Sequence, residues 1–482
     1  MKTTILVGTI LMSGLFTGCN NKKKPEQPNV IILLADDLGY NDLTCYRDNH
    51  AFSTDRPPTC KTPNIDRLAD EGMRFTDFYA GAAVCSPSRS ALITGRNCTR
   101  VGIYNWIPGG QPMHLRDREV TIAEMLKVEG YRTGHFGKWH LTSEGMGQPL
   151  PMDQGFDYAF FAYNNAQPSH HNPVNYFRNG EPEGLREGYA CQIVMDEALS
   201  WLDTIRKPDE PFFLNIWFNE PHSKEAAPPA LAEQHEYLKQ YYGCIENMDM
   251  AVGRLLAYLD LHDLNDNTIV IFSSDNGSDK PNSNLPLRGR KALNFEGGIR
   301  DPFIIKYPGV VPEGTVSDAP GSFTDVLPSL AAFTRAEVPD DRVIDGVDMT
   351  PVFRGDEDAP ERETPIFFYR YFHDPVSMLR EGDWCLLGFV DPIPLQENYD
   401  VRELAKLKPA PGDPPWSMWG FNKTHMEYLL DQEPQHFELY NLEEDIAQEH
   451  DVSAEHPDRV AEMIRTALRL RKEMIEEGGN WY

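Results

Sequence analysis

Four side chains that carry oxygen ligands follow two apolar runs of the sequence. Asp36 and Asp37 come directly after the first run, and Asp275 and Asn276 come directly after the second. Such β-branched and aliphatic runs predict buried strands, and open α/β sheets bind ligands at the carboxyl ends of their strands. Either pair alone would be explained by an ordinary turn. Together they predict a hard, all-oxygen site suited to Ca²⁺ or Mg²⁺.

A cysteine stands at the start of a predicted helix. Ser86 is a suitable N-cap, Pro87 fits the first helical position, and Gly95 predicts the helix end. Residue 85 would then lie at the positive end of the helix dipole, where anions bind. The spacing argues against a phosphatase loop, because only three residues separate Cys85 from Arg89. A thiolate is also a poor partner for a hard metal ion.

This cysteine lies in a specific motif. The run Cys85-Ser86-Pro87-Ser88-Arg89 matches the Cys-x-Pro-x-Arg signature at which type I sulfatases have their cysteine oxidised to formylglycine, and Thr94-Gly95-Arg96 matches the second half of that signature. The chain therefore resembles the type I sulfatases. The resemblance extends over most of the chain, through residues 36–37, 137–140, 221–222, 274–277, 291, 296–298 and 438–442. It departs from the family pattern at Asp301, where an apolar residue is common.

The resemblance implies an alkaline-phosphatase-like fold and the hydrolysis of a sulfate ester. Cys85 would become formylglycine, and the hydrated aldehyde would bind the metal through one oxygen and attack sulfur with it, giving a covalent sulfated enzyme. A formylglycine-generating enzyme or an anaerobic sulfatase-maturating enzyme would then be a necessary partner. The implied metal is one Ca²⁺ per chain in preference to Mg²⁺, with five ligand positions: Asp36, Asp37, Cys85, Asp275 and Asn276.

The resemblance also assigns roles to the basic residues. Arg89 would hold the formylglycine oxygens and the neighbouring carboxylates, and Lys138 and Lys291 would contact the sulfate. His222 would protonate the departing alcohol, and His140 would be the base that expels sulfate and regenerates the aldehyde. Fixed cations suit this reaction because sulfuryl transfer builds negative charge on oxygen. Taken singly, a lysine is usually a solvated charge and a histidine is usually a packed one.

Substrate contacts are less marked in the sequence. Asn105, Trp106, His170 and His171 lie in predicted loops and are candidate sugar contacts, because aromatic faces and amide or imidazole donors suit carbohydrates. Ordinary loop packing explains them equally well. The predicted function is hydrolysis of a sulfate ester on a carbohydrate. The alternatives are a phosphoester or phosphonate ester hydrolase on the same scaffold, and an inactive homologue that binds sulfated glycans.

Strands and helices alternate along the chain and must position these residues. The expected strands are 30–35, 74–79, 131–136, 211–218 and 268–274, and the expected helices are 62–70, 86–95, 121–128 and 230–261. This alternation predicts an α/β fold with a large, mostly parallel sheet flanked by helices. Beyond about residue 351 the segments become charged and Pro-punctuated, with strands at 365–371 and 384–389 and a helix at 457–477. They predict a smaller C-terminal α+β domain.

The N-terminus predicts export. Lys2 precedes an apolar stretch that is too short to span a bilayer, and Cys19 ends a lipobox-like site. A buried N-terminal helix is the alternative. We predict an exported lipoprotein, periplasmic or at the cell surface of a Gram-negative bacterium, with the lipid as its membrane contact. The predicted division is a signal peptide at 1–19, a tether at 20–28, a catalytic domain at 29–355, and a C-terminal domain with a short antiparallel sheet and terminal helix at 356–482.

The composition limits the classes of molecule that this protein could bind. The formal net charge of −29 argues against nucleic-acid binding, which needs basic surfaces. An anionic substrate would need a local cluster of cations to overcome this field. Of the eight cysteines, Cys45 and Cys60 bracket a Pro-rich loop and could form a disulfide. Free, buried cysteines fit the sequence equally well.

Overall fold

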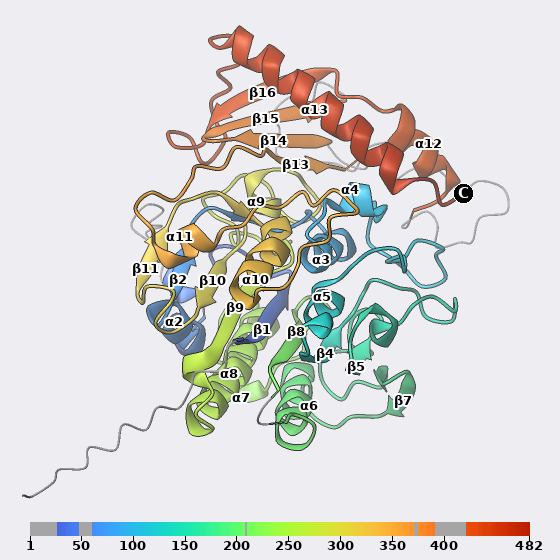
Figure 1. Cartoon of the computed structure of the whole chain (residues 1–482), viewed down its shortest axis with the longest axis vertical. Helices are drawn as coiled ribbons and strands as arrows, with labels where there is room; N and C mark the ends of the chain where they lie inside the picture. The colour runs from blue at the N-terminus through green and yellow to red at the C-terminus, as the bar shows by residue number, and fades with distance from the viewer. Residues whose placement is uncertain (1–26, 48–59, 208–209, 371–374, 391–420) are drawn as a thin grey trace, which may run out of the picture.

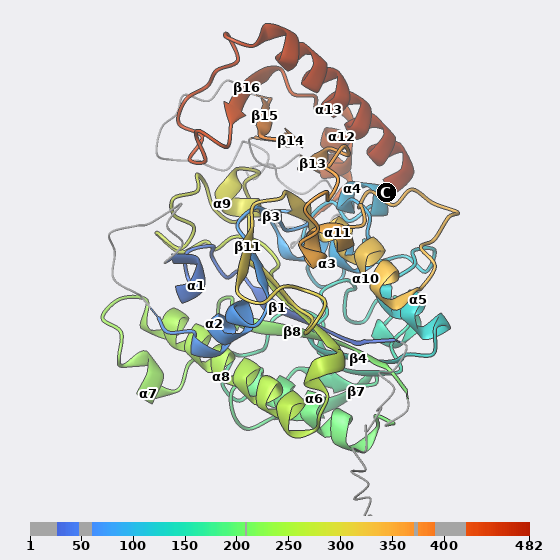
Figure 2. The same cartoon turned by 60° about the vertical axis from the view of Figure 1, so that its left-hand side comes forward.

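The computed structural model describes residues 27–47, 60–207, 210–370, 375–390 and 421–482 (Figure 1). The predicted signal peptide and nearly all of the predicted tether lie outside these ranges, as does Cys19. Within the described ranges, no helix combines the length and the apolar character needed to cross a membrane. A large sheet with its helices makes up one part of the molecule, and a small sheet with the last helix makes up the other (Figures 1 and 2).

The large sheet has ten strands. In spatial order they are β11 (Thr315–Ser317), β2 (Met73–Phe75), β10 (Phe303–Lys306), β9 (Thr268–Ser274), β1 (Asn29–Asp36), β8 (Phe212–Pro221), β4 (Arg132–Lys138), β5 (Tyr158–Ala162), β6 (Tyr176–Arg178) and β7 (Glu181–Gly184). The central neighbours β9, β1, β8, β4 and β5 are parallel, whereas β10, β6 and β7 run antiparallel to their neighbours. The prediction of a large, mostly parallel sheet is confirmed at its centre.

Helices cover both faces of this sheet. Alternate residues of β1 explain the two layers, because Ile32 faces one apolar core and Ile31 faces the other, and every residue of the strand is buried. The first core is covered by α3 (Cys85–Thr94), α5 (Ile122–Val128) and α10 (Val326–Thr334). The second is covered by α2 (Pro63–Asp70), α6 (Ala190–Thr204) and α8 (Lys239–Leu261).

The small sheet is antiparallel and four-stranded. Its strands are β13 (Ile366–Tyr369), β14 (Ser377–Glu381), β15 (Trp384–Phe389) and β16 (His436–Asn441). One face packs under α13 (Pro457–Gly478), and the opposite face packs on residues 293–299, which include α9 (Glu296–Ile299). The expected C-terminal sheet and terminal helix are therefore present, and the domain boundary at residue 355 stays a prediction.

Short elements complete the described chain. They are α1 (Thr44–Arg47), α4 (Cys98–Val101), α7 (Pro229–Ala232), α11 (Thr350–Arg354), α12 (Lys423–Asp431), β3 (Phe78–Tyr79), β12 (Gly321–Ser322) and the 3₁₀ turns Pro151–Gln154, Asn265–Asn267 and Phe323–Asp325.

Several local expectations were wrong. The strand expected at 74–79 is two strands, β2 and β3, and the helix expected at 230–261 is divided into α7 and α8. Helix α3 begins at Cys85, not at Ser86, whose hydroxyl instead accepts from the backbone N–H of Ile107. The seven described cysteines are all free, so Cys45 and Cys60 do not form a disulfide. The backbone N–H of Cys45 donates to Asp66 Oδ1, and the thiol of Cys60 donates to the carbonyl of Asp42, each at 3.0 Å.

Candidate active site

The predicted metal ligands converge at the carboxyl ends of two central strands of the large sheet. Asp36 ends β1 and Asp275 follows the adjacent parallel strand β9, in which Ser274 pairs with Ala35. The backbone N–H of Asp37 donates to Asp275 Oδ1 at 3.2 Å, and Asn276 Nδ2 donates to Asp37 Oδ1 at 2.8 Å. All four side chains are at most 4% exposed. The parallel register therefore brings residues 240 positions apart into one buried cluster.

Cys85 lies against this cluster at the first residue of α3. Its Sγ, a carboxylate oxygen each from Asp36 and Asp37, and a ring nitrogen of His222 all lie within 4.8 Å of one another. Burial raises the pKa of the Cys85 thiol to about 12, although Lys138 and Lys291 favour the thiolate. An unmodified Cys85 is thus a neutral thiol near neutral pH and a poor nucleophile.

The cluster fits a hard cation. Asp36 Oδ1 and Asn276 Oδ1 are buried and accept no hydrogen bond from the described residues. Burial and the adjacent Asp36 raise the pKa of Asp275 to about 7, which reflects the cost of packing carboxylates together. A divalent cation would offset the repulsion between the carboxylates and would be coordinated by these two oxygens. The sulfur of Cys85 is a soft ligand, so an oxygen at the same position would bind a hard cation better.

Fixed cations surround the carboxylates. Arg89 Nε and Nη2 lie 2.9 and 2.7 Å from Asp275 Oδ2, and Arg89 Nη1 donates to the carbonyl of Lys138 at 3.0 Å. Lys138 Nζ donates to Asp36 Oδ2 at 2.7 Å, and Lys291 Nζ donates to Asp37 Oδ2 at 2.6 Å. Arg89 and Lys138 are fully buried. The chain thus has the local cationic cluster that its acidic surface requires for an anionic substrate.

These cations set the protonation state of the nearest acid. Burial alone would raise the pKa of Asp36, but Lys138, His222 and Arg89 hold it well below its usual range. The Asp36 carboxylate is therefore ionised and available to a metal.

The two predicted catalytic histidines differ in exposure and partners. His222 follows β8, and its Nε2 lies 3.4 Å from Asp37 Oδ2. His140 is 2% exposed, and its Nε2 donates to the carbonyl of Ile107 at 3.0 Å, which leaves a buried Nδ1 without a partner among the described residues. Burial, with Lys138 beside it, lowers the pKa of His140 well below its usual value. His140 is therefore neutral, with one nitrogen free to take a proton.

The four predicted sugar contacts differ in burial and in their partners. Asn105 is buried, and its Oδ1 accepts from Arg370 Nη2 at 3.2 Å, whereas Trp106 is half-buried. His170 is buried with Nδ1 3.9 Å from Glu220 Oε1. His171 stacks on the ring of Tyr189 with a centroid distance of 4.7 Å. Within the described residues, no recorded hydrogen bond or ion pair joins any of the four to the carboxylate cluster.

Arg370 is a polar residue at this site that the sequence interpretation missed. It directly follows the apolar strand β13, and its Nη1 donates to the carbonyl of Ala292, next to Lys291, at 2.6 Å. The rule that identified Asp36 applies to the strand ends of an open α/β sheet, so it gives no signal for a residue of the antiparallel small sheet.

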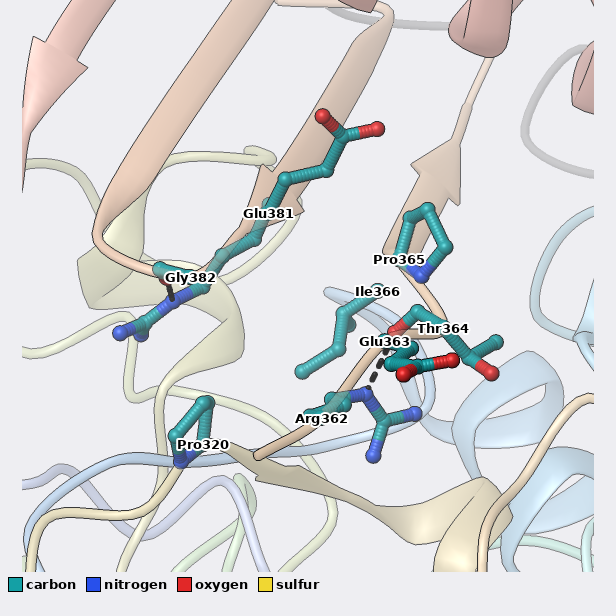
Figure 3. Close-up of a pocket in the computed structure, with 9 residues that line it drawn as sticks. Pro320, Arg362, Glu363, Thr364, Pro365, Ile366, Glu381 and Gly382 are labelled. Carbon is teal, nitrogen blue, oxygen red and sulfur yellow. Dashed lines mark hydrogen bonds between the residues drawn. The ribbon is translucent and has the colours of Figure 1, made fainter. Parts of the chain in front are cut away.

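A cavity of about 270 Å³ lies elsewhere, at the edge of the small sheet (Figure 3). It is lined by Pro320, residues 362–366, Arg380, Glu381 and Gly382, and contains none of the predicted site residues. Arg362 Nε donates to the carbonyl of Thr364 at 2.8 Å, and Nη1 donates to Asp325 Oδ2 at 2.6 Å. Cavity size therefore does not locate the site, and the strand ends do.

The fold and this site define a class. The large sheet covered by helices has the alkaline-phosphatase-like fold, and at its strand ends a buried carboxylate cluster faces fixed cations and the start of a helix. The chain belongs to the sulfatase family, because residues 28–336 match that family's model and named sulfatases are similar over most of its length. It is a sulfuric ester hydrolase.

Two relatives and one solved structure indicate the breadth of the similarity. N-acetylgalactosamine-6-sulfatase of Canis lupus familiaris is 34% identical over 72% of this chain and 69% of that protein. An ulvan-active sulfatase of Formosa agariphila is 30% identical over 76% of this chain and 74% of that protein. The crystal structure of Ps i-CgsB in complex with k-i-k-neocarrahexaose has a TM-score of 0.75 and 26% identity, and covers 93% of each chain.

A likeness to a different enzyme class shows the fold alone. The phosphonate monoester hydrolase of Agrobacterium radiobacter has a TM-score of 0.60 and 18% identity, with 93% of this chain and 96% of that chain covered.

Proposed function

We propose that this enzyme hydrolyses sulfate esters of a carbohydrate with a formylglycine made from Cys85 and a bound Ca²⁺. The observation that carries the proposal is the position of Cys85 Sγ, within 4.8 Å of ligand atoms of Asp36, Asp37 and His222 and at the start of α3. Similar proteins support the carbohydrate: one is named for N-acetylgalactosamine 6-sulfate esters, another for ulvan, and a third was crystallised with a neocarrahexaose.

The chemistry at position 85 needs an oxygen nucleophile. A neutral thiol with a pKa of about 12 attacks sulfur poorly and binds calcium poorly. A hydrated formylglycine supplies one hydroxyl that attacks sulfur and a second whose deprotonation releases sulfate and restores the aldehyde. This modification requires a formylglycine-generating or anaerobic sulfatase-maturating enzyme as a partner.

The chain's own cations stabilise the charge that develops. Lys138 and Lys291 each donate to a carboxylate of the cluster and can turn toward sulfate oxygens, and Arg89 holds Asp275 in place with a two-nitrogen fork. His140, neutral and with Nδ1 free, accepts the proton from the second hydroxyl. His222 donates a proton to the leaving alcohol.

The carboxylate cluster would hold the metal. Asp36, Asp37, Asp275 and Asn276 offer an oxygen set that suits Ca²⁺ better than Mg²⁺, because Ca²⁺ tolerates irregular and higher coordination. Ca²⁺ there supplies positive charge that stabilises an ionised nucleophile and polarises the bound sulfate. We further propose that the chain is an exported lipoprotein that acts on sulfated glycans outside the cytoplasm, on the strength of residues 1–19.

Three measurements test this function. Mass analysis of the peptide that contains residue 85 should show aldehyde in place of thiol, and Cys85→Ala should abolish sulfate release while the melting temperature changes little. Hydrolysis of an aryl sulfate should exceed that of an aryl phosphate or phosphonate ester. A preference for the phosphorus esters would favour the alternative hydrolase, and an unmodified, inactive protein that still binds sulfated glycans would favour the binding homologue. A panel of sulfated sugars then identifies the substrate.

A further inference from the structure

The backbone beside Lys291 is held from three directions. The N–H of Lys291 donates to the carbonyl of Ser278 at 3.2 Å, and the N–H of Ala292 donates to the carbonyl of Ala83 at 2.8 Å. The carbonyl of Ala292 accepts from Arg370 Nη1 at 2.6 Å. Ala83 is two residues before Cys85. The dipeptide of Lys291 and Ala292 is therefore hydrogen-bonded to the segment of the proposed nucleophile, to the loop after β9 and to Arg370 beside the small sheet.

Ala292 adopts a backbone conformation that needs such support. Its φ is 76°, in the left-handed region that residues with a side chain seldom occupy. Such conformations persist where surrounding contacts fix them, and they recur at functional sites. Both polar groups of the Ala292 backbone are hydrogen-bonded. Losing one of these bonds would free the residue to relax and to move the adjacent Lys291.

Arg370 is fixed to the small sheet. Its backbone N–H donates to the carbonyl of Val376 at 2.7 Å, and its Nη2 donates to Asn105 Oδ1 at 3.2 Å. Asn294 Nδ2 also donates to the carbonyl of Val376, at 3.2 Å. The apolar side chains of residues 293, 295 and 299 share a core with one face of the small sheet. Helix α9 lies next to that sheet in both views (Figures 1 and 2). The small sheet therefore forms a rigid backing for the Lys291 segment.

We propose that Arg370 is a positioning residue for sulfate binding, which acts by fixing the backbone of Ala292 and thereby the Nζ of Lys291. The inference rests on the proposed contact between Lys291 and sulfate. Arginine is needed because its planar fork donates to two acceptors in different directions, the carbonyl of Ala292 and the amide oxygen of Asn105. A lysine could hydrogen-bond well to at most one of these two acceptors, and its ammonium would not fix their relative positions.

The test compares two conservative variants in the calcium-loaded protein. Arg370→Lys should weaken the binding of inorganic sulfate, measured by calorimetry, and lower kcat/KM on an aryl sulfate, each by about tenfold, as expected for a lost charge-assisted hydrogen bond. Arg362→Lys is the matched control. Arg362 precedes β13 and also links the small sheet to the part of the molecule that holds the large sheet, but it donates to Asp325 beside the cavity of Figure 3. The control variant should change both quantities by less than about twofold, because Arg362 and Asp325 share no hydrogen bond with Ala292 or Asn105 among the described residues.

The route through Lys291 is tested in a second background. In Lys291→Ala, the further change Arg370→Lys should weaken sulfate binding by less than about twofold, because the residue that it positions is gone. Full additivity of the two changes would overturn the inference, as would unchanged sulfate affinity in Arg370→Lys alone. If Arg370→Lys fails to fold, Arg370→Gln replaces it, and misfolding of both beside a folded Arg362→Lys would assign Arg370 a structural role and reject the positioning role.

The proposed function fails separately. A wild-type protein that neither binds sulfate nor hydrolyses an aryl sulfate would refute the function itself, whereas normal wild-type activity with an unaffected Arg370→Lys would refute only the inference.

Discussion

The protonation state of a single residue at this site depends on its burial and on its hydrogen-bond partners. His140 illustrates this, because the bond from its Nε2 to the carbonyl of Ile107 decides which nitrogen is free, and burial decides that the ring is neutral. The sequence indicated the residue through its motif. It gave no means of deciding between the two nitrogens, since that depends on a loop 33 positions away.

The proposed role of His140 leads to a kinetic prediction. His140→Gln should lower kcat on an aryl sulfate by about 100-fold or more, because a positioned base is lost, while KM should not rise. The control is His262→Gln, since His262 is exposed at the C-terminal end of α8 and stacks on Tyr258, and steady-state kinetics should be unchanged. Equal effects of the two changes would contradict the assignment of His140 as the base.

Asp301 leads to a stability prediction. Its carboxylate is 1% exposed, and neither oxygen has a hydrogen-bond partner among the described residues. Burial, and then the nearby Asp275, raises the pKa of Asp301 well above its usual value. The folded state therefore binds this proton more tightly than the unfolded state, so the residue's contribution to stability falls as pH rises above about 4, the unfolded pKa.

Asp301→Val should accordingly stabilise the protein, and more so at high pH. We expect a gain of about 1–3 kcal/mol in the free energy of unfolding at pH 8, and a smaller gain at pH 5. Denaturant unfolding at both pH values measures it. A loss of stability at pH 8 would show that the carboxylate has a favourable partner.

Helix ends show how far an element can be predicted from local sequence. Helix α2 covers Pro63–Asp70 of the expected range 62–70, but the hydroxyl of Thr62, the residue before it, makes no capping bond. The backbone N–H groups of Asn64 and Ile65 donate instead to the carboxylate of Asp249, at 3.0 and 2.8 Å. A cap supplied by a residue 185 positions away leaves no local signature, so the helix could be predicted from the sequence but its N-terminal cap could not.

Asp249→Ala should therefore destabilise the protein by about 1–2 kcal/mol, as the loss of a helix cap does. The control is Asp260→Ala in the same helix α8, since Asp260 forms an exposed pair with Arg67 at 2.7 Å, with side chains 41% and 39% exposed. Exposed pairs contribute little, so this change should cost less than about 0.5 kcal/mol. Chemical denaturation of the two variants compares them directly, and the reverse order of effects would refute the capping role.

At the scale of the whole molecule, the centre of the fold was predictable and its edges were not. Strands β1, β8 and β9 are buried on both faces, so each contains a largely apolar run that stands out in the sequence. The edge strand β7 reads Glu181-Pro182-Glu183-Gly184, with no apolar pattern to reveal it. The site residues follow the same division: ligands at central strand ends were identified, and Arg370, from the small sheet, was not.

A metal held by the carboxylate cluster would connect β1, β9 and α3, so removing it should affect the entire fold. Treatment with a chelator should lower the melting temperature, and Ca²⁺ at 100 times its dissociation constant should restore about 3 kcal/mol of stability, with Mg²⁺ less effective. Calorimetric melts with each ion measure this. In Asp275→Asn the response to Ca²⁺ should shrink, because one carboxylate of the cluster is gone. Melting that is indifferent to chelator and to both ions would contradict a metal at the carboxylate cluster.

The pairing of β1 with β9 has a consequence for how the chain acquires its structure during synthesis. Asn29 and Thr268 are partners 239 positions apart, and β8 and β9 lie on either side of β1. At ribosomal rates of about 5–20 residues per second, the first strand to emerge waits roughly 10–50 s for its last neighbour. Throughout that delay at least one edge of an apolar strand is open to other nascent chains. Protection of β1 by a chaperone until β9 has been made should therefore raise the yield of folded enzyme.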